Sequence, residues 1–220
     1  MNQAFDIIIV GAGMVGAALA TGLGQQGIRV ALIDKAEPSA FDASSAPDIR
    51  VSALSAGSER YLDSLGAWHS ILAMRATPYR RLAVWDETPN PLSRLLPPSL
   101  TEVEFSAEQL GARHLGHIVE NSITQQALWQ SAEAEPDVAL ITGRSVQDLK
   151  QDQQLARVTL DDGSQLEAQL VIGADGAMSR VRDLAGIGVT RDQYDQQAMV
   201  ISVRYRGSVE DITWQGFYPS

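Results

Sequence analysis

Residues 5–34 decide the fold: Phe5-Asp-Ile-Ile-Ile-Val10 leads into Gly11-Ala-Gly13-Met-Val-Gly16, and a second apolar run, Arg29-Val-Ala-Leu-Ile33, ends on Asp34. The three glycines follow the spacing G-x-G-x-x-G. This order predicts a strand, a tight turn, a helix and a second strand that ends on an acidic side chain. A strand, turn and helix without any ligand is the alternative interpretation, because glycine-rich turns are common.

Each part of this unit suits a dinucleotide. Gly11 permits the sharp turn, Gly13 leaves room for a pyrophosphate, and Gly16 lets the helix pack close to the sheet. The phosphates would lie at the helix N-terminus, where unpaired N–H groups and the helix dipole favour negative charge. Asp34 would bind a ribose and repel a 2′-phosphate, which favours FAD or NAD over NADP. The predicted cofactor-binding residues of this unit are Gly11, Ala12, Gly13, Met14, Val15, Gly16, Asp34 and Lys35.

The composition excludes several classes of function. The net charge of −10 makes nucleic acid an improbable partner, since such binding needs a basic face. The chain has no cysteine, which excludes disulfides and thiolate metal sites and suits a reducing compartment. We expect neither a cleaved secretion signal nor a membrane-spanning segment, so the expected location is the cytoplasm.

The pattern along the rest of the chain alternates between helices and strands. We expect a helix through residues 60–65, a helix at 68–74, a strand at 79–85, and a loop at 88–100 that contains four prolines. Ser122 is the expected N-cap of a further helix. Three short strands follow at 138–142, 155–160 and 165–168, the last two joined by a hairpin at 161–163. Residues 170–174 form a buried strand, and 199–205 and 212–218 form a final pair.

This order predicts an α/β fold: a Rossmann-like, doubly wound sheet with a β-meander insertion and the start of a second, mixed β-sheet domain. We expect residues 1–75 and 113–188 to form the two parts of the cofactor-binding domain. Residues 76–112 are expected to be an insertion of the substrate domain, and 189–220 the start of its sheet. A final strand with a bare edge indicates a piece of a longer protein.

A second motif follows the buried strand: Leu170-Val-Ile-Gly-Ala-Asp175-Gly176-Ala-Met-Ser179-Arg180-Val-Arg182. The strand delivers Asp175 to its carboxyl end, Gly176 allows a close turn, and Ser179 and Arg182 lie on the next helix. Ligands of open parallel sheets bind outside the carboxyl ends of the strands, so this turn can face the same ligand as the first. A simple NAD-dependent dehydrogenase does not need this element.

The Asp175-Gly176-x-x-Ser179-x-x-Arg182 pattern resembles the second fingerprint of the flavoprotein aromatic hydroxylases, the single-component FAD monooxygenases. Within that family, 116–121, 127–129 and 170–176 resemble the bacterial ubiquinone-biosynthesis hydroxylases. Residues 74–82, 185–188 and 201–203 are most similar to the octaprenyl-methyl-methoxy-benzoquinol hydroxylases. The resemblance adds these candidate cofactor-binding residues: Arg50, which would face the flavin, Glu120, Asn121, Asp175, Gly176, Ser179 and Arg182.

The resemblance implies bound FAD, with NAD(P)H as a transient co-substrate that reduces it. Dioxygen would then form a flavin C4a-hydroperoxide, which hydroxylates a polyprenylated phenol or benzoquinol. The partners implied are this small molecule and, by extension, a ubiquinone-biosynthesis complex and peripheral contact with the inner membrane. The third family motif, Gly-Asp-Ala-Ala-His, is absent, so we expect the N-terminal part of an enzyme that is inactive alone.

Structural roles are the alternatives for several of these residues. Asp175 could be a helix N-cap, and Arg50 a solvated loop residue. Glu120 and Asn121 could simply start a helix, and Ser179 and Arg182 could serve only their turn. No metal is expected, because His114 and His117 lack a third ligand at a suitable spacing.

Two other functions are left open by the sequence. One is a different FAD enzyme on the same fold, an aromatic hydroxylase of another substrate class or a prenyl reductase. The other is a non-catalytic, nucleotide-binding subunit of a biosynthetic complex. Catalytic residues are not assigned by either fingerprint, because both address the cofactor.

Overall fold

A computed structural model describes residues 3–86, 102–207 and 210–218. The expected loop at 88–100 therefore lies outside the described residues. The helices are α1 (Met14–Gly24), α2 (Ala56–Ser64), α3 (Trp68–Met74), the 3-10 helix η3 (Glu108–Leu110), α4 (Asn121–Ala134) and α5 (Arg180–Leu184). The strands are β1 (Gln3–Ala4), β2 (Ile7–Val10), β3 (Val30–Asp34), β4 (Val51–Ser55), β5 (Ala76–Tyr79), β6 (Arg81–Asp86), β7 (Glu102–Ser106), β8 (Gly116–Glu120), β9 (Val138–Thr142), β10 (Val146–Gln151), β11 (Ala156–Leu160), β12 (Gln165–Ala168), β13 (Leu170–Gly173) and β14 (Ile212–Phe217).

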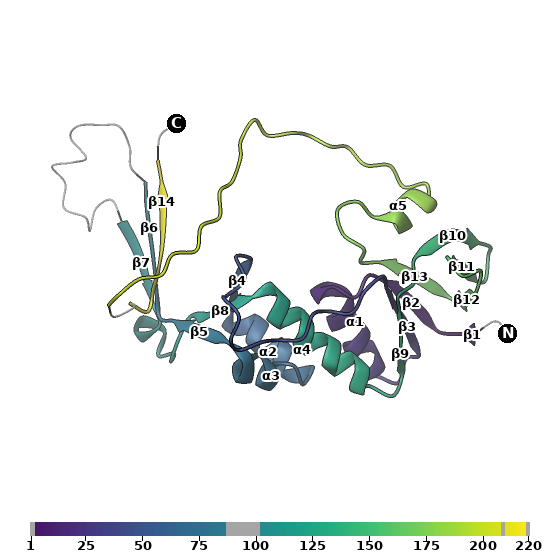
Figure 1. The fold of residues 1–220 in the computed structure, drawn as a ribbon, viewed down its shortest axis with the longest axis horizontal. Coiled ribbons are helices and arrows are strands. Elements are labelled where there is room, and N and C mark those ends of the chain that lie inside the picture. The colour runs from purple at the N-terminus through teal and green to yellow at the C-terminus, as the bar shows by residue number, and fades with distance from the viewer. Residues whose placement is uncertain (1–2, 87–101, 208–209, 219–220) are drawn as a thin grey trace.

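The central sheet has the strand order β13-β2-β3-β9, and all of its neighbours pair in parallel (Figure 1). Helix α1 connects β2 to β3, and α4 precedes β9, as in a crossover between parallel strands. The carboxyl ends of all these strands consequently meet at one edge. The predicted α/β fold with a Rossmann-like sheet is confirmed.

The two faces of this sheet bury different cores. Helices α1 to α4 cover one face, where Ile9, Leu32 and Leu128 are almost fully buried. The other face is covered by the sheet β1-β12-β11-β10 and by α5, around Ile8, Ile33 and Val158. Both faces of the two inner strands, β2 and β3, are thus shielded from water, which explains their continuous apolar runs. The burial predicted for the strand at 170–174 is wrong: β13 lies at the edge of the sheet, where its residues are half-buried or exposed and Leu170 is 50% exposed.

The meander differs from the predicted one in its membership. Residues 138–142 join the parallel sheet as β9, and the meander consists of β10, β11 and β12. Strand β10, Val146–Gln151, was not predicted, because its polar sequence carries a weak apolar alternation and a bulge interrupts its pairing. The hairpin predicted at 161–163 is confirmed by the antiparallel pairing of β11 with β12.

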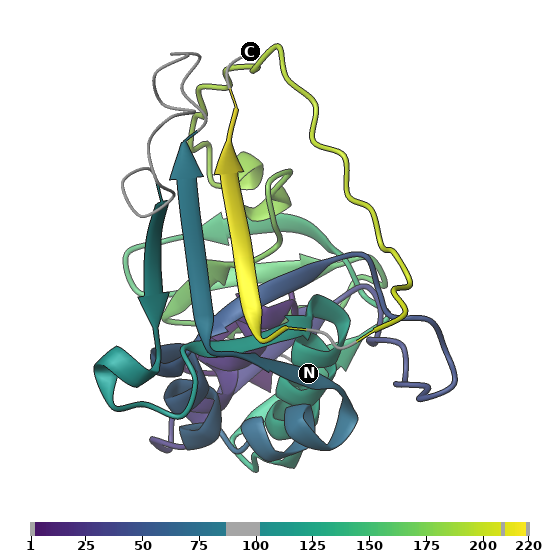
Figure 2. The same ribbon diagram turned by 90° about the vertical axis from the view of Figure 1, so that its left-hand side faces the viewer.

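Two further three-stranded sheets have the orders β4-β8-β5 and β14-β6-β7. Figure 2 shows β6, β7 and β14 side by side, with β14 in yellow. The strand predicted at 199–205 is wrong: these residues lie in an irregular, exposed segment that leads from α5 to β14. Among the described residues, no strand pairs with this segment, and the predicted partner, β14, pairs in parallel with β6 instead.

The start of α4 also differs from the prediction. Its N-cap position is held by Glu120 rather than by Ser122, because β8 continues to Glu120 and the helix begins directly after it. Ser122 is exposed on the first turn. In the part of the chain that the structure describes, no helix is both long enough and apolar enough to cross a bilayer.

We expect Gly16→Ala to destabilise the protein by about 3 kcal/mol or more, because the added Cβ would lie 1.8 Å from the Gly11 carbonyl oxygen. Gly13→Ala is the matched control, since its Cβ would have no neighbour within 4 Å. Its cost should be about 1 kcal/mol or less, that of a poorer N-cap. Urea unfolding of both variants measures the difference, and equal stabilities would contradict the close packing.

Candidate cofactor site

The turn between β2 and α1 presents an uncapped helix start. Gly11 has φ +101°, and a Cβ there would lie 2.4 Å from the Ala174 carbonyl oxygen, so only glycine fits. Gly13 occupies the N-cap of α1, where no side chain accepts a hydrogen bond from the helix and no acidic residue lies in the first turn. The space beside Gly13 is open. An anionic group is the natural partner of such a helix start.

Asp34 lies at the carboxyl end of β3, beside the glycine turn. Its Oδ2 accepts a hydrogen bond of 2.6 Å from the Ala12 N–H, and its Oδ1 accepts one of 3.1 Å from the Ala36 N–H. The Gly11 N–H donates to the Ile33 carbonyl at 2.7 Å. These bonds fasten the first turn to the end of the second strand. Lys35 follows in an exposed position.

Asp175 closes the second turn and caps α5 from a distance. Its carboxylate accepts hydrogen bonds from the Ser179 hydroxyl and from the N–H groups of Arg180, at 2.6 Å, and Val181, at 3.1 Å. Burial works to raise the pKa of Asp175, but the bonds from Ser179 and the backbone outweigh it and hold this pKa below the usual value. The helix-capping role considered for Asp175 is therefore present, while the conventional N-cap position belongs to Ser179.

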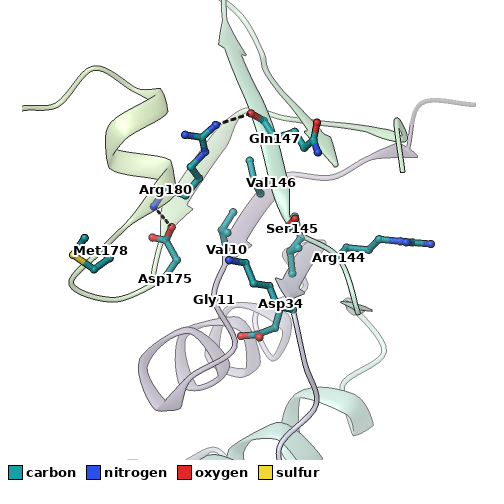
Figure 3. Close-up of a pocket in the computed structure, with 12 residues that line it drawn as sticks. Val10, Gly11, Asp34, Arg144, Ser145, Val146, Gln147, Asp175, Met178 and Arg180 are labelled. Carbon is teal, nitrogen blue, oxygen red and sulfur yellow. Dashed lines mark hydrogen bonds between the residues drawn. The ribbon is translucent and has the colours of Figure 1, made fainter. Parts of the chain in front are cut away.

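The two turns open into one pocket of about 620 Å³ at the carboxyl edge of the central sheet. Figure 3 shows Asp175 and Arg144 on opposite sides of it, with Val10 and Gly11 between them. The structure thus brings Gly11, Asp34, Lys35 and Asp175 together, as the two fingerprints predicted. The lining residues are Val10, Gly11, Ile33, Asp34, Lys35, Arg144, Ser145, Val146, Gln147, Asp175, Met178 and Arg180.

Sequence reasoning missed the wall of this pocket formed by the start of β10. Arg144 lies in the turn after β9, where it forms ion pairs with Asp162 at 3.0 Å and Asp161 at 4.0 Å. Arg180 reaches the same wall and donates to the Gln147 carbonyl at 3.3 Å. The position of Arg144 in the sequence could have indicated this wall, because Arg144 follows a strand of the parallel sheet at the edge where ligands bind.

Arg50, Glu120 and Asn121 lie outside the lining of this pocket. Arg50 is exposed just before β4, and its carbonyl accepts a hydrogen bond from the Asn121 N–H at 2.9 Å. Glu120 is buried and forms an ion pair of 2.9 Å with Arg75. The Asn121 Oδ1 accepts from the Ser52 hydroxyl at 2.6 Å. Through these contacts Glu120 and Asn121 hold β4, β8 and α4 together. Their contact with a cofactor stays a prediction.

Ser179 and Arg182 also lie outside the main pocket and line a neighbouring hollow of about 300 Å³. Ser179 caps α5, accepting from the Arg182 N–H at 3.0 Å. The Arg182 Nη1 donates to the Ala177 carbonyl at 3.1 Å, and its Nη2 lies 3.6 Å from an Asp183 carboxylate oxygen. These contacts hold the second turn in shape. Gly176, with φ +86°, gives this turn its left-handed residue.

We expect Asp175→Asn to make the free energy of unfolding less dependent on pH between pH 6 and pH 3. Because the folded pKa of Asp175 is lowered, its stabilisation is complete above the unfolded value, about 4, and is lost as pH falls through the folded pKa. Wild type should therefore exceed the variant in urea-unfolding stability at pH 6, and the gap should close toward pH 3. Asp63→Asn on α2 is the control carboxylate. Parallel curves for wild type and Asp175→Asn would refute this role.

Three curated proteins similar to this chain carry ubiquinone or a ubiquinol in their names. The chain is 47% identical to the 3-demethoxyubiquinol 3-hydroxylase of Escherichia coli (strain K12) over 219 residues, covering 99% of this chain and 53% of that protein. It is 33% identical to the ubiquinone hydroxylase UbiL of Rhodospirillum rubrum, over 100% of this chain and 48% of that protein. The human ubiquinone biosynthesis monooxygenase COQ6 is 32% identical, with 47% of it covered. The chain thus spans about half the length of these relatives.

Solved structures of flavin-dependent monooxygenases share the fold. PqsL from Pseudomonas aeruginosa, described as a probable FAD-dependent monooxygenase, matches with a TM-score of 0.67 at 23% identity, over 87% of this chain and 48% of PqsL. PieE, solved with FAD and substrate, matches with a TM-score of 0.61 at 19% identity, over 83% of this chain and 32% of PieE. The FAD binding domain family matches residues 4–216. This match covers nearly the whole chain, and it places the protein in the FAD binding domain family.

Proposed function

We propose that this chain, extended to the length of its curated relatives, is an FAD-dependent monooxygenase that hydroxylates a polyprenylated benzoquinol ring in ubiquinone biosynthesis. The observation that carries the proposal is the 47% identity to the E. coli hydroxylase, which runs through both turns of the pocket. We call this longer form the extended protein. NAD(P)H and dioxygen are its proposed co-substrates.

The residues of the pocket fit FAD. The open, uncapped start of α1 suits a pyrophosphate, and no acidic residue in its first turn opposes the negative charge. Lys35 and Arg180 bring cationic side chains to the lining of the pocket, although the chain as a whole has a net charge of −10. Arg144 also lines it, but its guanidinium is paired with Asp161 and Asp162. Asp34 lies at the strand end where a carboxylate can bind a ribose.

Each residue then has a proposed task. The N–H groups of Gly13, Met14 and Val15 bind the pyrophosphate, Asp34 accepts from the ribose hydroxyls, and the wall at Val146 packs against the adenosine. Asp175 and Gly176 position the second turn beside the phosphates. Arg50, exposed before β4, is the proposed contact of the flavin ring. The bound flavin supplies the oxygen-activating chemistry, while the protein orients it and excludes water.

The substrate class sets two further proposals. A polyprenyl chain is insoluble in water, so the extended protein should meet its substrate at the surface of a bilayer, through peripheral contact with the inner membrane. Membership of a ubiquinone-biosynthesis complex would likewise bring the water-insoluble substrate to the protein. The chain alone is proposed to be inactive, because it is half as long as relatives that carry the activity in their names.

We expect Gly13→Ala to weaken FAD binding by at least about tenfold, or about 1.4 kcal/mol, because the methyl group would occupy the space proposed for the pyrophosphate. The fold should persist, since that methyl group meets no protein atom within 4 Å. Titration of the apo form of the extended protein with FAD measures the affinity. Gly22→Ala, in the last turn of α1, is the control. Unchanged affinity for Gly13→Ala would contradict the proposed position of the phosphates.

We expect the extended protein, supplied with FAD, NAD(P)H and oxygen, to convert a short-chain 3-demethoxyubiquinol into a product one oxygen atom heavier. Mass spectrometry with ¹⁸O₂ detects the transferred atom. Oxygen transfer to simple phenols but not to the quinol would instead indicate another aromatic hydroxylase. FAD binding without NAD(P)H oxidation on any aromatic substrate would indicate a non-catalytic subunit.

A further inference from the structure

A compact cluster of two histidines and a carboxylate lies away from the cofactor pocket. Glu59 comes from α2, His117 from β8, and His114 from the turn that leads into β8. The Glu59 Oε1 lies 2.7 Å from the His117 Nδ1, and its Oε2 lies 2.8 Å from the His114 Nε2. The sequence argument against a metal required a third ligand near the histidines. The fold supplies it from 55 residues upstream of His114.

The Glu59 carboxylate of this cluster is buried and needs a partner that balances its negative charge. Glu59 and His117 are each 8% exposed, and His114 is half-buried. Among the described residues, no arginine or lysine forms an ion pair with Glu59. Burying a carboxylate is costly unless a cation or a metal ion balances it. The two imidazole rings are the groups placed to balance this carboxylate, either as hydrogen-bond donors or as co-ligands of a metal ion.

The donor set matches a transition metal. One ligand atom from each residue lies within 4.8 Å of the others, and two imidazole nitrogens with one carboxylate oxygen form a known zinc set. Tetrahedral metal bonds of about 2.0–2.2 Å place ligand atoms about 3.4 Å from one another. The two Glu59–histidine contacts, 2.7 and 2.8 Å, would each lengthen by roughly 0.6 Å to admit the ion. The partial exposure of His114 leaves one side for a water ligand.

The neighbouring side chains hold the rings in place. The Trp68 ring of α3 packs edge-on against the His117 ring, with 5.1 Å between the ring centroids. The two histidine rings also pack edge-on, with 4.5 Å between their centroids. None of the three cluster residues lines the cofactor pocket. A metal here would join α2 to β8, and β8 is the central strand of the sheet that contains β4. Such an ion would stabilise the sheet β4-β8-β5, whose strand β4 begins directly after Arg50.

We propose that Glu59, His114 and His117 bind one divalent transition metal ion, Zn²⁺, as a structural site that fastens α2 to β8. The inference does not depend on the proposed hydroxylase activity, because the cluster lies outside the cofactor pocket. The ion replaces the two hydrogen bonds between the carboxylate and the rings. Its coordination is completed by water.

Equilibrium dialysis of the extended protein against Zn²⁺, followed by elemental analysis, tests the proposal. We expect about one zinc per chain in wild type, with an affinity that falls at least about 100-fold in Glu59→Gln and in His114→Ala, since loss of a ligand should cost more than loss of its supporting contacts. Glu59→Gln keeps the size and hydrogen-bonding capacity of the side chain. His69→Ala, an exposed histidine on α3, is the matched control and should keep its zinc.

Thermal unfolding gives a second readout that does not involve activity. Zinc should raise the Tm of wild type and of His69→Ala by about 5 °C, and should leave Glu59→Gln unchanged. Zinc binding that survives in Glu59→Gln, or that is lost equally in His69→Ala, would overturn the proposal. Absence of zinc binding in wild type would also overturn it and would leave a purely hydrogen-bonded cluster.

Discussion

The structure depends on the close approach of α1 to the end of β2. Gly16 packs against the Gly11 carbonyl, and Gly11 in turn passes close to Ala174 at the end of β13. This contact fixes the start of the helix at the carboxyl edge of the parallel sheet. The helix therefore starts directly after Gly11, which lines the pocket, and the space beside Gly13 at its N-cap is open. The main physical feature of the site follows from packing between backbone atoms.

Hydrogen bonds from the backbone to two carboxylates stabilise the same edge. Asp34 accepts from Ala12 and Ala36, and Asp175 accepts from the N-terminus of α5. Each carboxylate fixes one turn, and both turns border the same pocket. Lys35 and Arg180 add positive charge around them in an otherwise acidic chain. Such a site suits a ligand with both ribose hydroxyls and phosphates.

The parts predicted correctly are those that local chemistry specifies. Glycine spacing and an acidic strand end identified the β2-α1-β3 unit, and Asp161-Asp162-Gly163 identified the hairpin. The parts missed depend on distant partners. Residues 199–205 alternate like a strand but pair with none of the described strands, and the place of β9 in the parallel sheet is set by its pairing with β3, more than 100 residues earlier.

In the site, too, the residues predicted correctly belong to local sequence patterns, and the residues missed depend on contacts between distant parts of the chain. Gly11 and Asp34 are local features of one unit, and Asp175 was predicted from its place after the apolar run that forms β13. The wall at Arg144 and Val146 depends on how the meander folds back over the sheet. Glu59 meets His114 only through the packing of α2 against β8, which no short spacing indicates. The ion pair of Glu120 with Arg75 was likewise beyond local reasoning.

A crystal structure of the extended protein with bound FAD tests the central claim most directly. We expect pyrophosphate oxygens within about 3.2 Å of the N–H groups at the start of α1, and a ribose hydroxyl hydrogen-bonded to Asp34. We also expect the adenosine to pack against the wall formed by Arg144 and Val146. A pyrophosphate bound elsewhere, with the start of α1 facing only water, would contradict the account.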